Sequence, residues 1–120
     1  MIRNLVVSGV LLLAVGASVA TTVSRRPTDR FDLSTHEQRR YQAKFVGGKK
    51  ALAVCIGNGS TFLGLYAYDQ YGNCIARDDL NEVGARDDLA VEWYPESDGE
   101  YTVEVINFGQ RVNQGELALK

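Results

Sequence analysis

The sequence predicts an all-β protein: a small antiparallel β-sandwich of about seven strands, with Greek-key or jelly-roll-like connections. Short segments in which apolar and polar residues alternate are separated by clusters of Gly, Pro, Asn, Asp and Ser. Beyond residue 40 the sequence lacks the helical period that the crossover of a βαβ unit would need. The 120 residues suffice for one domain with a single core behind a leader and a short linker.

The first 20 residues are predicted to be a signal peptide. They carry Arg3 as their only charge, continue as an apolar run from Leu5 and end in Ser-Val-Ala. Charged, apolar and small residues in this order are typical of export with cleavage, here after Ala20. The apolar run of about 16 residues is shorter than a membrane-spanning helix needs. We therefore expect an exported protein that touches a membrane only through this segment before cleavage.

Residues 21–39 are predicted to be a basic linker. The stretch is polar, contains Pro27 and shows no apolar period. Ser34 with Glu37 three residues later matches a capping box, so a short helix is a second expectation here.

The charge of the chain is unevenly distributed. Residues 21–50 carry eight Lys and Arg against three Asp and Glu, whereas residues 51–120 carry four against twelve. A basic segment can contact an acidic polymer or a membrane surface. The segment has no sustained basic run and no interleaved aromatic residues. We therefore favour a segment that is solvated or folded onto its own acidic domain. We expect no nucleic-acid partner.

The predicted β-sandwich domain spans residues 40–120. Its predicted strands are 41–46, 49–56, 62–69, 74–78, 89–94, 100–109 and 115–120. A Gly-Gly turn joins the first two strands, "QYGN" joins the third and fourth as a hairpin, and "PESDG" follows the fifth. Trp93 shares a face with Leu89 and Val91, so it is predicted to lie in the core.

Cys55 and Cys74 are the only cysteines. Two cysteines in an exported protein usually form one disulfide, and closing a loop of this length stabilises a fold by roughly 3 kcal/mol in the chain-entropy model. We expect the Cys55–Cys74 disulfide, with two buried free thiols as the alternative.

The phrase Ala-Arg-Asp-Asp-Leu occurs twice, at 76–80 and 85–89, between two predicted strands. The spacing is too short for a solenoid repeat, so we interpret it as a chance likeness. Calcium takes about six to eight oxygen ligands, and acids lie at both ends of this loop and at the end of a neighbouring strand. The candidate calcium ligands are Asp69, Asp78, Asp79, Asp87 and Asp88. The alternative, which we favour, is a charged loop in water.

Tyrosines provide a second candidate site. Tyr66 and Tyr68 alternate away from the leucines of their predicted strand, and Tyr71 lies in the turn that follows. Exposed together, they would form a patch that contacts a sugar or a peptide. Packed across strands with their hydroxyls in water, they would be ordinary sheet residues. The expected partner is an unknown protein or polysaccharide outside the cytoplasm.

The sequence offers no catalytic set. The only histidine, His36, precedes the predicted domain, and no Gly-x-Ser-x-Gly motif occurs. Short loops on a domain of this size leave little cleft for a pair of catalytic carboxylates. We expect a protein that is not an enzyme.

Two segments resemble a known family. "LYAYDQYGN" ends a strand with an aspartate before a Gly-Asn turn, and "YPESDGEYTVEV" leads through Pro, Gly and Tyr into the penultimate strand. From about Arg40 onward the chain resembles the bacterial pre-peptidase C-terminal domain. The resemblance implies a calcium-associated, non-catalytic β-sandwich of secreted proteases and small exported proteins. Members often carry a run of aspartates; the corresponding residues here are Asn58, Ser60, Phe62 and Gly64.

The expected function is therefore an exported, non-catalytic binding or accessory module with an unknown ligand. One alternative is a calcium-stabilised adhesion or surface module that uses the loop from Asp78 to Asp88. Another, implied by the resemblance alone, is a partner or inhibitor of an exported protease.

Overall fold

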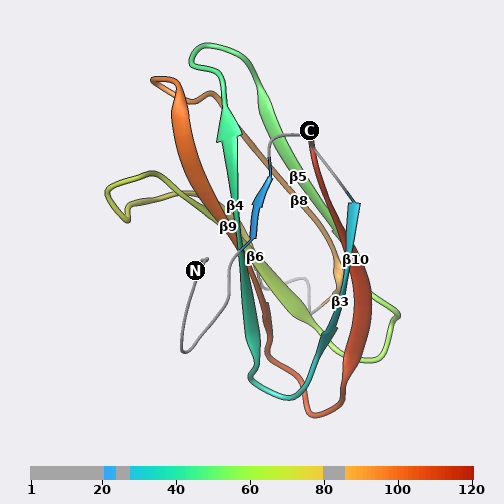
Figure 1. The fold of residues 1–120 in the computed structure, drawn as a ribbon. Coiled ribbons are helices and arrows are strands. Elements are labelled where there is room, and N and C mark those ends of the chain that lie inside the picture. Colours follow the sequence, from blue (N-terminus) through green and yellow to red (C-terminus); the bar gives the residue numbers. More distant parts are fainter. Residues whose placement is uncertain (1–20, 24–27, 80–85) are drawn as a thin grey trace.

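The computed structural model describes residues 21–23, 28–79 and 86–120, and the structural statements below concern these residues (Figure 1). The predicted signal peptide lies outside the described residues, as does the middle of the loop that carries the repeated phrase. No helix in the described ranges is long and apolar enough to span a membrane.

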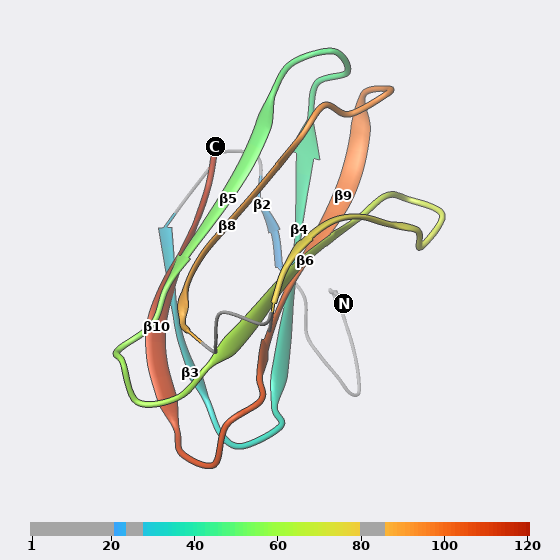
Figure 2. The same cartoon turned by 180° about the vertical axis from the view of Figure 1, so that it is seen from behind.

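Two sheets pack face to face, and Figures 1 and 2 show this sandwich from opposite sides. One sheet has the order β3-β10-β5-β8 and the other β2-β4-β9-β6-β7. The strands are β2 (Thr21–Val23), β3 (Thr28–Leu33), β4 (Gln38–Phe45), β5 (Ala51–Ile56), β6 (Leu63–Tyr68), β7 (Cys74–Asp78), β8 (Asp88–Trp93), β9 (Gly99–Asn107) and β10 (Asn113–Leu119). Neighbouring strands pair antiparallel, except that β2 runs parallel to β4. The predicted all-β sandwich is confirmed.

Alternation along the strands builds the core. Every second residue of β4, β5, β8 and β10 faces inward, as the two-residue period of a strand requires. Phe45, Trp93 and Tyr101 meet at one end of this core, with ring centroids 5.1–6.3 Å apart. Trp93 is 6% exposed, which confirms its predicted core position.

The predicted hairpin of the third and fourth strands is β6–β7. Asp69 N–H donates to the Asn73 carbonyl at 3.0 Å, and Gly72 adopts a φ of 86°, which favours glycine. The turn at residues 69–73 extends beyond the body of the sandwich in both views (Figures 1 and 2). By contrast, the strands before and after the Gly47-Gly48 turn belong to different sheets, so this turn carries the chain across the sandwich.

The predicted linker is wrong, because the sandwich already includes β3 and the start of β4. Phe31 and Leu33 are 3% and 1% exposed, and β3 pairs with β10 along its length. The predicted short helix is a turn: Glu37 N–H donates to the Ser34 carbonyl, and the Glu37 carboxylate accepts from Ser34 N–H at 2.7 Å. The capping-box pair thus closes a strand-to-strand turn. In this turn His36 has a φ of 63°.

The expected disulfide is also wrong, since both cysteines are free thiols. Cys55 faces the core from β5 in one sheet, whereas Cys74 is exposed on β7, the edge strand of the other sheet. A disulfide needs two Cβ atoms about 4 Å apart, whereas here one thiol is buried in the core and the other is exposed on the opposite sheet. Burial, helped by the charges of Asp87 and Asp88, raises the pKa of the Cys55 thiol to about 12.

Candidate functional site

The candidate calcium ligands are engaged in separate local contacts. Asp69 closes its own turn by accepting from Asn73 N–H and Tyr71 N–H, both at 2.9 Å, and the hydrogen bonds from Asn73 and then Tyr71 lower the pKa of its carboxyl. Asp79 accepts from the Tyr66 hydroxyl at 3.1 Å. Asp87 accepts from Gly59 N–H at 2.7 Å in a different loop.

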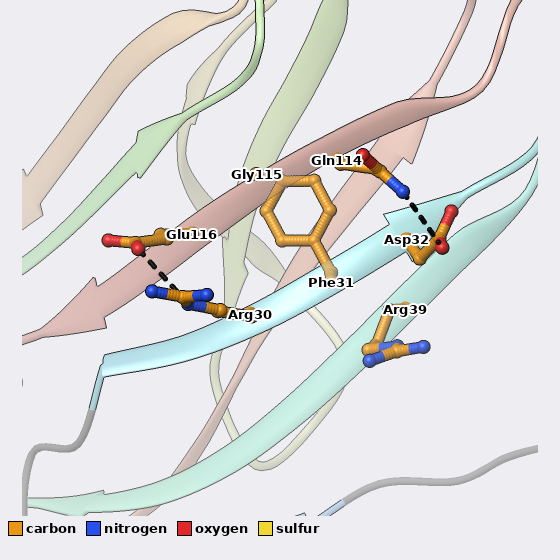
Figure 3. A pocket seen from close by; sticks show the side chains of 7 residues that line it. All are labelled: Arg30, Phe31, Asp32, Arg39, Gln114, Gly115 and Glu116. Carbon is orange, nitrogen blue, oxygen red and sulfur yellow. Dashed lines mark hydrogen bonds and ion pairs between the residues drawn. The ribbon is translucent and has the colours of Figure 1, made fainter.

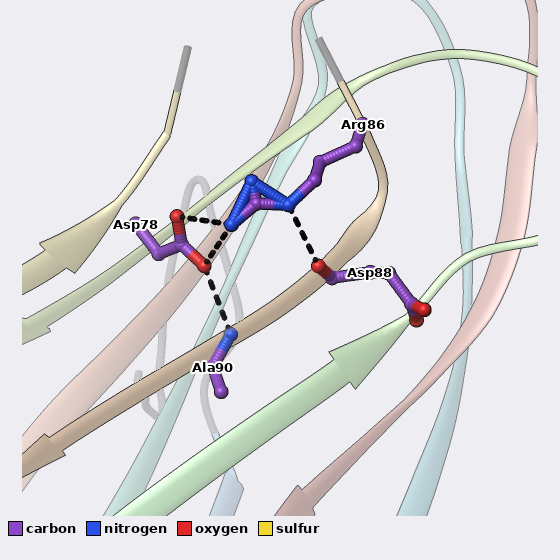
Figure 4. Close-up of polar contacts among 4 residues, drawn as sticks. All are labelled: Asp78, Arg86, Asp88 and Ala90. Carbon is purple, nitrogen blue, oxygen red and sulfur yellow. Dashed lines mark hydrogen bonds and ion pairs between the residues drawn. The ribbon is translucent and has the colours of Figure 1, made fainter. Parts of the chain in front are cut away.

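Asp78 pairs with Arg86, and Asp88 contributes only its backbone to this contact (Figure 4). Arg86 Nη2 donates to both carboxylate oxygens of Asp78 at 3.0 and 3.1 Å, while its Nε donates to the Asp88 carbonyl at 3.2 Å. Ala90 N–H also donates to Asp78, at 3.1 Å. The Asp88 carboxylate points away from this group (Figure 4). Asp78 and Arg86 thereby satisfy polar groups along the edge strand β8, which would otherwise be open to another strand.

Among the described residues, these carboxylates are not gathered as the ligands of one calcium ion would be. Calcium needs about six to eight converging oxygens, most of them from carboxylates and carbonyls. In the parts of the chain that the structure describes, no three His, Cys, Asp or Glu side chains come together in a way that would hold a metal. Asp78 and Arg86 instead connect the end of β7 with the start of β8.

Of the three tyrosines expected to form a binding face, Tyr66 and Tyr68 lie on the outer face of the five-stranded sheet. Tyr66 and Tyr68 are half-buried, and their rings stack with centroids 6.5 Å apart and an interplanar angle of 30°. Tyr71 is 83% exposed in the turn beyond them. Burial, and then the hydrogen bond to Asp79, raises the pKa of Tyr66 above its ordinary value.

Glu104 lies beside this pair, and the sequence did not predict it as a site residue. It is 3% exposed, although it belongs to the outer face of β9. Arg40 Nε donates to it at 2.9 Å, and the Tyr68 hydroxyl donates to it at 3.1 Å. A carboxylate removed from water needs such partners, because an unpaired buried charge is costly. Burial, together with the charge of Glu104, raises the pKa of Tyr68 to about 12.

A pocket of about 350 Å³ opens next to Tyr68, between the sheet and the β6–β7 turn. It is lined by Arg40, Gln42, Tyr68, Asp69, Gln70, Gly72, Glu100 and Thr102. Within the described residues, the side chains of Gln42, Gln70, Glu100 and Thr102 make no hydrogen bond or ion pair, so their polar groups are available to a ligand. We call this site the tyrosine pocket. Sequence reasoning found Tyr68 and Asp69 but missed the others, because only strand pairing brings them together.

A second pocket, of about 580 Å³, lies along β3 and β10 (Figure 3). It is lined by Arg30, Phe31, Asp32, Arg39, Gln114, Gly115 and Glu116. Its polar groups are paired: Arg30 lies 3.4 Å from Glu116, and Gln114 donates to Asp32 at 3.3 Å (Figure 3). Because these contacts would have to break before a ligand could use the same groups, the tyrosine pocket is the stronger candidate.

The fold and this site define a small antiparallel β-sandwich with a polar, aromatic-edged pocket on one outer face. No family model matches the sequence, and no curated protein matches it. Among solved structures, the chain is similar to the pre-peptidase C-terminal domain of a collagenase from Bacillus anthracis. The TM-score is 0.67 at 16% sequence identity, over 87% of this chain and 97% of that one. The chain therefore has the fold that the resemblance in its sequence implied.

Proposed function

We propose that this protein is an exported, non-catalytic binding or accessory module that holds its ligand in the tyrosine pocket. The observation that carries the proposal is the group of side chains without protein partners beside the stacked Tyr66–Tyr68 pair, among them Gln42 and Thr102. These side chains are half-buried or exposed and line an open pocket, where a ligand can take the place of water as their hydrogen-bond partner.

The surroundings of the pocket favour binding because they are already ordered. Tyr68 is held by Tyr66 on one side and by Glu104 through its hydroxyl, and Glu104 is in turn held by Arg40. Side chains that are fixed before a ligand arrives lose less conformational entropy when it binds. Gln42, Tyr68 and Thr102 also lie on strands, which hold the geometry of a site better than loops do.

Export is supported by the signal-peptide pattern of residues 1–20. The accessory role is supported by the similar structure, which is the pre-peptidase C-terminal domain of a collagenase.

Among the described residues, the histidine and the exposed thiol lie in separate surroundings. His36 lies in the β3–β4 turn, where its backbone N–H donates to the Asn107 carbonyl at 2.8 Å. The exposed thiol of Cys74 lies near the Ala76 carbonyl, 3.6 Å away, and not beside a base. Nucleophilic catalysis requires a nucleophile and a base within hydrogen-bond reach.

The test is a heteronuclear NMR titration of the purified exported protein with polysaccharides and with secreted proteins, exported proteases included. We expect one of these to shift the resonances of Gln42, Thr102 and Tyr68, and we expect Gln42→Ala to weaken binding. Gln114→Ala is the matched control, because it removes the same amide from the pocket on the other sheet. Binding that is equally weakened by both variants, or that shifts only residues around Gln114, would overturn the proposal.

A further inference from the structure

The tyrosine pocket lies over paired strands, so a ligand there meets side chains and not free backbone. Thr102 of β9 is paired with Gln42 of β4 on one side and with Tyr68 of β6 on the other. An extended peptide gains most of its affinity by adding a strand to an open sheet edge, where backbone groups are unpaired. A peptide in this pocket could therefore not form the main-chain hydrogen bonds on which this mode of recognition depends.

The lining also lacks an apolar anchor site. Its eight residues include no aliphatic side chain, and Tyr68 is the only aromatic one. Protein interfaces usually depend on a buried aromatic or aliphatic anchor in a well-packed apolar pocket. A ligand that presents many hydroxyl groups and little hydrocarbon matches this lining better.

The available polar groups suit a ligand that both donates and accepts hydrogen bonds. Gln42 and Gln70 each offer an amide N–H₂ and a carbonyl, Thr102 offers a hydroxyl, and Glu100 offers a carboxylate. Adjacent hydroxyls of a sugar can donate to one atom and accept from another. The face of the Tyr68 ring is electron-rich and attracts the positively polarised C–H groups on one side of a sugar ring.

The charges in the pocket disfavour an acidic ligand. Arg40 is its only cation, and its Nε is already directed at Glu104, 2.9 Å away. The carboxylates of Asp69 and Glu100 also line the pocket, and no cation pairs with them among the described residues. Like charges repel, so an acidic polysaccharide would be penalised here.

We infer that the tyrosine pocket binds a ring of an uncharged oligosaccharide, stacked on Tyr68 and hydrogen-bonded by Gln42, Gln70 and Thr102. This inference rests on the proposed function, because it names the class of ligand for the same site.

The experiment is isothermal titration calorimetry of the purified exported protein with four oligosaccharides of equal length: a glucan, a mannan, a chitin fragment and an oligogalacturonate. We expect at least one uncharged oligosaccharide to bind and the oligogalacturonate to bind more weakly. Each lost hydrogen bond should weaken affinity by roughly two- to tenfold, so Gln42→Ala and Gln70→Ala should each produce a loss in this range. Gln114→Ala should leave the affinity unchanged, and thermal unfolding establishes that each variant is folded.

Three results would overturn the inference. They are no binding by any uncharged oligosaccharide, tighter binding of the oligogalacturonate, and affinities that are the same in Gln42→Ala and Gln70→Ala as in the unaltered protein. If a secreted protein shifts the NMR resonances of the pocket while no oligosaccharide binds, the inference fails and the proposed function stands. If neither class of ligand acts at the pocket, both fail.

Discussion

Arg86 donates from Nη2 to both carboxylate oxygens of Asp78, at 3.0 and 3.1 Å, and so joins the two sheets (Figure 4). The two residues are only eight positions apart in the sequence. Asp78 ends β7 in the five-stranded sheet, and Arg86 precedes β8 in the four-stranded one. The phrase that occurs twice in the sequence supplies both partners, Asp78 from its first copy and Arg86 from its second. The pair holds the edge of the sandwich closed where the chain crosses from one sheet to the other.

Removing the Asp78 carboxylate should destabilise the fold. We expect Asp78→Ala to lower the free energy of unfolding by about 1–2 kcal/mol, because it breaks charge-assisted hydrogen bonds and leaves Ala90 N–H without its partner at the sheet edge. The value is modest since Arg86 is 47% exposed and water screens the pair. Urea unfolding measures the change. The control is Glu116→Ala, which breaks the more exposed pair with Arg30 and should cost under about 0.5 kcal/mol. Equal losses in both variants would contradict this role of Asp78.

Arg40 should contribute to stability because it pairs with the buried carboxylate of Glu104. In Arg40→Ala, Glu104 remains buried without its cation, and we expect a loss of about 1–3 kcal/mol, reduced from the full value for a buried pair because Arg40 is 57% exposed. The double variant Arg40→Ala/Glu104→Gln removes the unpaired charge and should recover most of the loss. Denaturant unfolding of the two single variants and the double variant completes the thermodynamic cycle. A double variant that is no more stable than Arg40→Ala would show that Glu104 is not the reason for the loss.

Stability should decline in alkali through Tyr68. Its pKa is about 12 in the folded protein, against about 10 for an unfolded chain, so the folded state holds the phenol proton more tightly. This contribution is fully present below pH about 10 and is lost as the pH rises to about 12. Urea unfolding over this range should show a decline that is shallower in Tyr68→Phe. Gln42→Ala, a neighbouring change without a titrating group, should keep the slope of the unaltered protein. If stability falls as steeply with pH in Tyr68→Phe as in the unaltered protein, other titrating groups cause the loss.

The two thiols should react differently. Cys74 is exposed and should be labelled by a thiol reagent in the folded protein, whereas Cys55 is buried, with its pKa raised to about 12, and should react only after unfolding. In Cys74→Ser we expect no labelling until denaturant is added. A reducing agent should leave the thermal midpoint unchanged. If no free thiol is detected even in denaturant, the two cysteines form a disulfide and this prediction is wrong.

Calcium should have little effect on stability. The described carboxylates do not converge, and Asp87 is tied to Gly59 N–H and to the amide of Asn113. We expect the thermal midpoint to agree within about 1 °C between EDTA and millimolar calcium. A ligand at a hundred times its dissociation constant adds about 2.7 kcal/mol, which would raise the midpoint by roughly 10 °C or more. A shift of that size, abolished in Asp88→Asn, would establish a calcium site in this loop.

Much of the fold could be predicted because it depends on local alternation. Strand β7 spans the predicted residues 74–78, and the inward position of Trp93 follows from its spacing to Leu89 and Val91. Strand β3 was missed because its two buried residues, Phe31 and Leu33, stand among charged ones in a stretch too short to show a period. Local pattern alone could not distinguish it from a linker.

The candidate site was only partly predictable. That Tyr66 and Tyr68 share an outer face follows from the two-residue period of a strand. That Arg40, Glu104 and Tyr68 come together does not, because they lie on three strands whose order in the sheet is not the order of the chain. For the same reason, the closeness of the acidic residues in the sequence did not predict a shared site. In the fold, these residues make separate contacts.

By itself, the sequence determined the class of fold, the strands with a clear two-residue period and the hairpin turn at Gly72, since each depends on residues close together in the chain. Only the tertiary structure decided which strands are neighbours, and with them the free thiols of Cys55 and Cys74, the burial of Glu104 and the pocket beside Tyr68. The physical reason is that backbone pairing and side-chain packing act between segments far apart in the sequence. Alternation specifies that a face is buried, but it does not specify what covers it.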